Sequence, residues 1–497
     1  MQRILGTRSV SWLLLWAIAA GAAFDAAAQT LDPFNPLPGG SPKAVALQPD
    51  GKIIIASQIQ TVGTTGVVDI ARLEPDGSLD PDFIGPSAVN GEIKAVAVQA
   101  DGKIVIGGTF DTINSIPHHY LGRLNSNGTL DTGFVDPELN GTVWSIAVQP
   151  DGKILAAGSF ALSGSTSRGR LARFTNTGGL DTTFVDPQIC DSEAHGLALQ
   201  ANGSVVVSGY FYHIGNCSET PPYNEFLARF TSTGSFDSTF PTDTPPGPIG
   251  GGIAIGPDGS IYVPGGYATS DSISLRLVSK LSSSGALITS FANLHNDGAA
   301  NTLALQVDGK LLVGGVFQVI DAQARHGLLR LNADGSLDTG FADLNFSLDA
   351  THPNGTIFAL ASQTDGSTIA TGNFSLVNGQ SRQYAARVIS AGIAVSKLSG
   401  QGSGGNVIVT WTRSGTGPEL AQPPILMHSS NGVTYTGAGT MTRISSGWQF
   451  TAPYNVAGTP FYLRADAYTS SGAGNGSAGR ISSPVYVSDR IFANGFE

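Results

Sequence analysis

The feature that most constrains the fold of this chain is a segment of about fifty residues that recurs along the sequence. The line KAVALQPDGKIII begins at residue 43 and returns six more times with substitutions. The turn residues of the seven copies lie 51, 50, 51, 56, 50 and 57 residues apart; they are Asp50, Asp101, Asp151, Asn202, Asp258, Asp308 and Asp365. A period of this length is typical of solenoids and propellers.

A second line, ARLEPDGSLDPDF at residue 71, follows inside the period and occurs in six copies. Both lines have β-rich runs of four to six residues on either side of a turn such as Pro-Asp-Gly, which predicts β-hairpins. Two hairpins per period predict a four-stranded antiparallel unit. No segment has the sustained 3.6-residue apolar spacing of a helix. The Asp-Gly pairs are interpreted as turns, although their acidic spacing also resembles calcium loops.

The two ends of the repeat region indicate how the units are arranged. The seventh copy breaks off after residue 392 without an L-D-x-x-F segment, whereas Leu31-Asp32-Pro33-Phe34 stands alone before the first copy. A ring would use this N-terminal segment as the outermost strand of its last blade. We therefore expect an all-β chain in which residues 29–390 form a seven-bladed β-propeller with four-stranded blades, closed by the N-terminal strand.

The first strand of each repeat alternates large and small apolar residues. In the first copy Val45 and Leu47 alternate with Ala44 and Ala46, and the other copies have similar patterns. Large residues would face one neighbouring blade and small residues the other. Such packing fills the narrowing space near the axis of a ring without voids or overlap.

The lines ALQPDGKI at residue 46 and LNADGSLDTGF at residue 331 resemble those of the delta-60 repeat family of predicted β-propeller proteins. The resemblance covers residues 31–390. It implies a propeller fold and an exported setting, and it implies no demonstrated activity.

The remaining segments predict export and a second domain. Residues 1–28 have a positive start, an apolar stretch over 10–23 and an Ala-Ala-Ala cleavage site, so we expect a signal peptide. The mature chain would begin at Gln29 and be extracellular or on the surface of a bacterial cell. Its two cysteines, Cys190 and Cys217, would form a disulfide under oxidising conditions. Residues 391–488 have short alternating strands around Trp411 and resemble a fibronectin type III or immunoglobulin-like β-sandwich; residues 489–497 form a C-terminal tail.

Charge and hydropathy exclude several classes of partner. The formal net charge is −11 and no cluster of Lys or Arg is present, which argues against nucleic acid and anionic membranes. No stretch of the mature chain has the 18 consecutive apolar residues of a transmembrane helix. We expect a monomer that binds a polysaccharide or a cell-surface protein.

One position in the repeat is chemically diverse, and it lies seven residues before each turn residue. It is occupied by Lys43, Lys94, Trp144, His195, Gly251, Asn301 and Phe358. A cationic and aromatic rim at the channel mouth suits an anionic or sugar-like ligand, although the same side chains could merely plug the mouth.

The function predicted from this rim is binding without catalysis. None of the seven positions holds a carboxylate, and no metal or cofactor motif is identifiable, so no catalytic residue, metal ligand or cofactor is assigned. The chain would be an exported binding or surface-scaffold protein that presents variable loops on one face of a propeller. The alternative is a propeller enzyme, a lyase or glycan-acting hydrolase, with its site at the channel mouth.

Overall fold

The structure, a computed structural model, consists of β-strands and connecting loops. It describes residues 30–57, 59–67, 69–161, 169–187, 189–190, 193–211, 213–214, 225–241, 252–265, 268–269, 272–390, 392, 394–403, 406–431, 434–453, 461–469, 471–472 and 480–487. Within these ranges no helix is present, so the described part of the chain is all-β as predicted.

Seven antiparallel sheets follow one another between residues 30 and 390, and each has an inner, a middle and an outer strand. The inner strands are β2 (Ala44–Leu47), β7 (Ile93–Val98), β12 (Val143–Val148), β16 (Glu193–Leu199), β20 (Ala254–Ile255), β25 (Ala299–Leu305) and β31 (Thr356–Ser362). The middle strands are β3 (Ile53–Ala56), β8 (Ile104–Gly108), β13 (Ile154–Ala161), β17 (Val205–Phe211), β21 (Ile261–Pro264), β26 (Leu311–Val316) and β32 (Ser367–Asn373). The outer strands are β6 (Ile70–Leu73), β11 (Leu121–Leu124), β14 (Gly169–Phe174), β19 (Glu225–Phe230), β24 (Val278–Leu281), β29 (Leu328–Leu331) and β35 (Ala385–Ile389).

The Asp-Gly pairs form the turns between inner and middle strands, as predicted. In the first repeat the Gly51 N–H donates to the carbonyl of Gln48 at 2.9 Å, and Gly51 has a φ of +86°. Asp50 Oδ1 accepts a hydrogen bond from the Lys52 N–H at 3.1 Å. Glycine adopts this left-handed conformation without steric cost, and aspartate caps the turn with its own carboxylate.

The prediction of four-stranded blades was wrong for the first five sheets, which have three strands. Where a fourth strand was expected, one bridge joins Leu73 to Leu79 in the first repeat, and equivalent single bridges occur in the next five. The chain then turns away, because Asp80 accepts hydrogen bonds from the N–H groups of Asp82 and Phe83. A tight turn stabilised by aspartate therefore ends the fourth strand after one residue pair.

The last sheet does have a fourth, outermost strand, and it comes from the N-terminus. Strand β1 (Thr30–Leu31) pairs with β35, with Thr30 opposite Ile389 and Leu31 opposite Val388. The predicted partner sheet is thus correct, although the paired residues are 30–31 and not 31–34.

Additional short strands lie at the end of the sheets where the inner strands begin. Hairpins of two short strands lie between the middle and outer strands of five repeats: β4 (Thr61–Val62) with β5 (Thr65–Gly66), β9 (Thr112–Ile113) with β10 (Ile116–Pro117), β22 (Ala268–Thr269) with β23 (Ser272–Leu275), β27 (Val319–Ile320) with β28 (Gln323–Ala324), and β33 (Leu376–Val377) with β34 (Gln380–Ser381). Two further short strands, β15 (Ile189–Cys190) and β30 (Phe346–Ser347), also pair at this end. Strand β15 pairs with β18 (His213–Ile214), which lies between β17 and β19, and β30 pairs with β33.

Buried apolar clusters lie between each sheet and the next, and also between the seventh sheet and the first. Between the last and first sheets, Val45 and Leu47 of β2 share a cluster with Ala359 and Ala361 of β31. The predicted packing of large against small residues is therefore confirmed. Dense packing of this kind holds neighbouring inner strands, and the side chains at their ends, in fixed relative positions.

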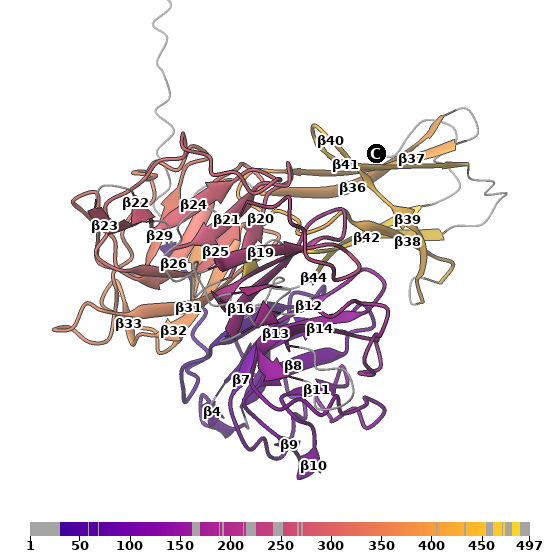
Figure 1. Cartoon of the computed structure of the whole chain (residues 1–497), viewed down its shortest axis with the longest axis horizontal. Helices are drawn as coiled ribbons and strands as arrows, with labels where there is room; N and C mark the ends of the chain where they lie inside the picture. Colours follow the sequence, from indigo (N-terminus) through magenta and orange to yellow (C-terminus); the bar gives the residue numbers. More distant parts are fainter. Residues whose placement is uncertain are drawn as a thin grey trace, which may run out of the picture.

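The C-terminal part of the chain forms two four-stranded antiparallel sheets (Figure 1). One contains β36 (Val395–Ser403), β37 (Asn406–Ser414), β41 (Gly447–Pro453) and β40 (Thr442–Ile444); the other contains β39 (Thr436–Thr440), β38 (Ile425–Ser429), β42 (Phe461–Tyr468) and β44 (Arg480–Val487). Trp411 is fully buried in a core to which both sheets contribute, for example through Trp448 and Leu426.

The C-terminal part is joined to the repeats by backbone hydrogen bonds at the sixth Asp-Gly turn. The N–H groups of Val307 and Asp308 donate to the carbonyls of Gly417 and Gly415 at 2.9 and 3.1 Å. Strand β43 (Ser471–Gly472) also pairs with β25, on the edge that β26 leaves free. The sequence did not indicate either contact.

Candidate functional site

The candidate site lies where the inner strands begin, at the end of the sheets opposite the Asp-Gly turns. Of the seven diverse positions, Gly251 lies outside the described residues. Lys43, Lys94, Trp144 and His195 are brought into one row of contacts, which we call the rim row. Asn301 is separate and donates from Nδ2 to the carbonyl of Ile357 at 3.0 Å. Phe358 is half-buried and does not join the row.

The centre of the rim row is the indole of Trp144. Lys94 Nζ from the preceding sheet lies 4.6 Å from the ring centroid, a cation–π distance. The imidazole of His195 from the following sheet is stacked on the indole, with centroids 5.0 Å apart and an angle of 10° between planes. Trp144 Nε1 is buried and has no hydrogen-bond acceptor within the described part of the chain. An acceptor on a ligand or a bound water would satisfy it.

The cationic end of the rim row is organised by Glu92, which the sequence reasoning missed. Its carboxylate accepts hydrogen bonds from Lys43 Nζ, from Lys94 Nζ at 2.5 Å and from Ser57 Oγ at 3.1 Å. Burial opposes the charge of Glu92, but the lysine hydrogen bonds outweigh it and lower the pKa of this carboxyl. Glu92 is therefore an anion held between two ammonium groups.

The aromatic end of the rim row continues beyond His195. His195 Nε2 lies 2.7 Å from Oε2 of Glu193, and the ring contacts Tyr210 edge-on with centroids 5.5 Å apart. Tyr210 contacts Phe226 at 6.0 Å in the same manner and is exposed to solvent. An exposed tyrosine beside a fixed imidazole suits contact with an amphipathic ligand such as a sugar.

The premise that the rim lacks carboxylates was therefore wrong. The seven positions contain none, but Glu92 and Glu193 lie two residues before Lys94 and His195. Each carboxylate contacts the side chain two residues later, Glu92 through Lys94 Nζ and Glu193 through His195 Nε2. The shared spacing in Glu-Ile-Lys and Glu-Ala-His was the signal that could have identified both carboxylates.

The first repeat departs from the others beside Glu92. Where the other six repeats have glycine, it has Ser57; the glycines are Gly108, Gly158, Gly209, Gly265, Gly315 and Gly372. Ser57 is buried, has a φ of +124° and directs its hydroxyl to Glu92. A non-glycine residue in this region is strained, and such strain is most often found at functional sites.

Asp69 is a second residue at which the first repeat differs from the others, and it is hydrogen-bonded to Ser57. The Ser57 N–H donates to the Asp69 carbonyl at 2.9 Å, and Asp69 has a left-handed φ of +58°. The equivalent residues in the second and seventh repeats are Tyr120 and Tyr384. Burial, and then repulsion from Glu92, raises the pKa of Asp69 to about 6.

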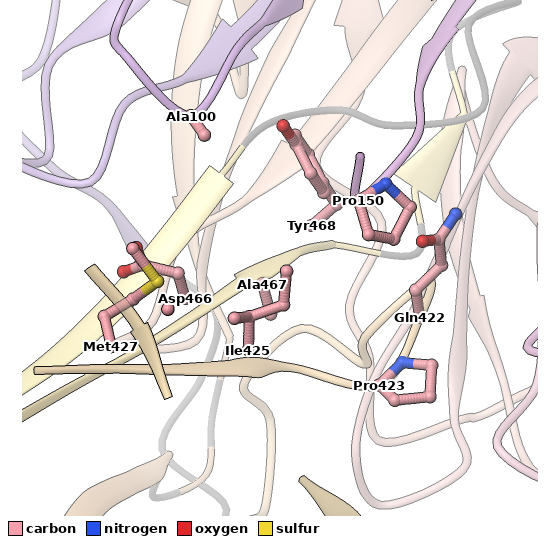
Figure 2. A pocket seen from close by; sticks show the side chains of 10 residues that line it. Ala100, Pro150, Gln422, Pro423, Ile425, Met427, Asp466, Ala467 and Tyr468 are labelled. Atoms are coloured by element: carbon pink, nitrogen blue, oxygen red, sulfur yellow. The ribbon is translucent and has the colours of Figure 1, made fainter. Parts of the chain in front are cut away.

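A separate cavity of about 240 Å³ lies at the opposite end of β7 and β12. Figure 2 shows Ala100 and Pro150 from the turns of the second and third repeats facing Ile425, Met427 and Asp466 of the C-terminal sheets. The cavity is mainly apolar. Sequence reasoning could not predict it, because it depends on the contact between two separately predicted domains.

The remaining predicted features are only partly within the described residues. The backbone of Cys190 pairs with His213, but its side chain and the whole of Cys217 lie outside them, so the disulfide stays a prediction. Among the residues that the structure describes, no group of three or more His, Cys, Asp or Glu side chains could hold a metal ion. The described part of the chain also contains no helix with the length and hydrophobicity needed to span a bilayer.

Five segments of the chain match the family described as "Domain of unknown function (DUF5122) beta-propeller". They are residues 48–83, 99–134, 149–184, 200–240 and 306–341, which are five of the repeats. The matches support a β-propeller repeat family for this region. No curated protein matches the sequence.

Two solved structures are similar to this chain at low sequence identity and low TM-score. A protein titled glycoside hydrolase is 12% identical, covering 91% of this chain and all of its own, with a TM-score of 0.28. Apo AztD from Citrobacter koseri is 11% identical, covering 89% of this chain and 97% of its own, with a TM-score of 0.26. Likenesses at these scores carry no argument about function.

Proposed function

We propose that the seven sheets form a closed, seven-bladed β-propeller and that residues 391–488 form a β-sandwich resembling a fibronectin type III module. The apolar cluster shared by β2 and β31 and the pairing of β1 with β35 support closure. The core shared by the two C-terminal sheets supports the sandwich. In this arrangement the rim row lies at the mouth of the central channel.

We propose that the chain is an exported, non-catalytic binding protein that takes up a glycan at the rim row. The observation that carries this proposal is the contact row from Lys94 through Trp144 to His195, which fixes cationic and aromatic groups side by side. Aromatic and charged groups on a rigid scaffold are characteristic of sites that recognise polar ring-shaped ligands. A cell-surface protein is the other partner that suits this surface.

Binding is tested by screening the mature protein against polysaccharides and surface extracts, with both bound ligand and released product measured. We expect saturable binding without turnover, weakened at least tenfold by Trp144→Ala. Tyr435→Ala, in the C-terminal part, is the matched control and should leave binding unchanged. Unchanged binding in Trp144→Ala, or equal weakening of binding in Trp144→Ala and Tyr435→Ala, would contradict a site at the rim row.

Export and monomeric state belong to the same proposal. The composition of residues 1–28 supports cleavage before Gln29, which N-terminal sequencing of the natural product tests. A mature chain that begins at Met1 would contradict export. Light scattering measures the molar mass of the purified protein and so tests whether it is a monomer.

A second candidate function, catalysis at the same end of the sheets, is favoured by one observation. Asp69 and Glu92 interact electrostatically and their pKa values are shifted in opposite directions. Such a pair can provide one protonated and one ionised carboxyl at the same pH, as acid–base enzymes require. Turnover of a polysaccharide that is abolished by Asp69→Asn, in a protein that still folds, would replace the binding proposal with a lyase or hydrolase.

A further inference from the structure

We propose that the ligand of the rim row is an acidic sugar, bound through Lys43 and Lys94, and that the charge on Asp69 sets the affinity for it. This inference rests on the proposed glycan-binding function and specifies its ligand class. It involves Ser57, Asp69 and Glu92, none of which is among the seven diverse rim positions.

The cationic end of the rim row carries a surplus of positive charge. Lys43 and Lys94 contribute two positive charges, and Glu92 between them contributes one negative charge. The side chains of Lys94 and Glu92 are only 12 and 13% exposed, whereas that of Lys43 is 40% exposed. The surplus positive charge is therefore presented to solvent mainly by Lys43, where the carboxylate of a uronic acid could bind it.

Asp69 is connected to the cluster through Ser57. The Ser57 N–H donates to the backbone carbonyl of Asp69, and the Ser57 hydroxyl donates to Glu92. Burial raises the pKa of Asp69, and repulsion from the Glu92 carboxylate raises it further, so the two carboxyls interact electrostatically. With Asp69 protonated, the cluster of Lys43, Lys94, Glu92 and Asp69 carries a net charge of +1. With Asp69 ionised, the net charge is zero.

The charge of the cluster changes with pH through Asp69. The pKa of Asp69 is about 6, so the cluster is positive below that pH and neutral above it. Uronate carboxyls stay ionised across this range, as ordinary carboxylic acids do. Binding of an anion should therefore weaken as the pH rises from 5 to 8. By linkage, an anion that raises the pKa of Asp69 by one unit when it binds would lose about tenfold in affinity over this range.

Other titratable groups also lie along the rim row. His195 and Glu193 lie at the aromatic end of the rim row, with Trp144 between His195 and Lys94. Histidine also titrates near neutral pH, so a pH profile of the wild type alone would not identify Asp69. A variant that fixes the charge of Asp69 is required.

The experiment is calorimetric titration of the mature protein at pH 5 and pH 8. The ligands are trisaccharides of galacturonate, glucuronate and mannuronate, each paired with its neutral methyl ester. The variants are Asp69→Asn, Asp69→Gly and Lys43→Gln. Asn tolerates a left-handed φ, and glycine occupies the equivalent place in the sixth repeat at Gly327, so at least one neutral variant should fold. Asp82→Asn and Lys397→Gln, both at exposed positions elsewhere, are the charge-matched controls.

We expect at least one uronate to bind at least tenfold more tightly than its ester at pH 5. Its affinity should be about tenfold lower at pH 8. Asp69→Asn or Asp69→Gly should retain the pH 5 affinity at pH 8, and Lys43→Gln should weaken uronate binding at both values. Equal binding of uronate and ester, or full pH dependence in folded Asp69 variants, would overturn this inference while the glycan-binding function stands. Failure of every acidic and neutral ligand to bind, here and in the polysaccharide screen, would overturn both.

Discussion

The guanidinium of Arg387 donates hydrogen bonds to the carboxylate of Asp32, which lies 355 residues earlier in the chain. Arg387 also lies over the ring of Phe34, with its Cζ 5.1 Å from the centroid. Inside the first repeat the same contacts join Arg72 to Asp80 and Phe83 across eight to eleven residues. The N-terminal segment thus takes, in the last sheet, the place that an L-D-x-x-F segment takes in the others.

We predict that Asp32→Asn destabilises the protein as much as Asp80→Asn does. Each change leaves a largely buried arginine without its anion, since the side chains of Asp32 and Asp80 are 10 and 0% exposed. Breaking such a pair costs about 3 kcal/mol of unfolding free energy. Denaturant unfolding measures the loss, with the exposed Asp82→Asn as the control. If Asp32→Asn were as stable as the wild type while Asp80→Asn was destabilised, the N-terminal segment would not be anchored in solution.

Stability should fall as the pH is lowered from 4 to 2. Burial opposes the charge of Asp80, but hydrogen bonds from Lys52, the Asp82 N–H and Arg72 lower its pKa to about 2. Because this value is below the ordinary one, the stabilisation is complete above about pH 4 and is lost as the pH falls through 2. This carboxyl alone accounts for about 2 kcal/mol. The equivalent residues Asp131, Asp181, Asp237 and Asp338 also have lowered pKa values and add to the effect.

Thermal unfolding between pH 2 and 7 tests this expectation. The melting temperature should drop most steeply below pH 4, and Asp80→Asn should make the drop shallower. A melting temperature that is constant down to pH 2 would contradict the proposed role of the repeated ion pairs.

Gly108→Ala should be poorly tolerated, whereas Gly66→Ala should be nearly neutral. A Cβ atom at Gly108 would lie 1.9 Å from the carbonyl oxygen of Glu92, but one at Gly66 would meet nothing within 4 Å. The backbone must therefore move at Gly108, which should cost about 3 kcal/mol. Because Glu92 would be displaced, ligand binding at the rim row should weaken as well. Equal stability of the two variants, measured by denaturant unfolding, would contradict this close approach.

Cys190 and Cys217 should form a disulfide in the exported protein. The bridge would close a loop of 27 residues and contribute about 3 kcal/mol through loop entropy. Peptide mapping by mass spectrometry, with and without reductant, detects it directly. Two free thiols in protein purified from an oxidising compartment would refute the prediction.

Features that are encoded within one repeat could be predicted from the sequence. The Asp-Gly turns depend on Gln48 to Lys52 and their equivalents, and the alternation of Val45 with Ala46 already indicates how neighbouring sheets pack. The fourth strand was predicted incorrectly because the hydrogen bonds of Asp80 turn the chain after one bridge. Glu92 was missed because its partners come from two repeats, and the cavity beside Met427 because its walls come from two domains.

The pairing of Ser471 and Gly472 with Ala304 and Leu303 limits which part of a ligand could enter the proposed channel. This short strand pairs with the edge of β25 that β26 leaves free. In the proposed closed ring that edge would face the channel, and the C-terminal part would reach into it from the end opposite the rim row. A long polymer could not thread through such a ring. A glycan entering at Trp144 would have to present a terminus or a side branch, and its recognition would then be selective for chain ends over chain interiors.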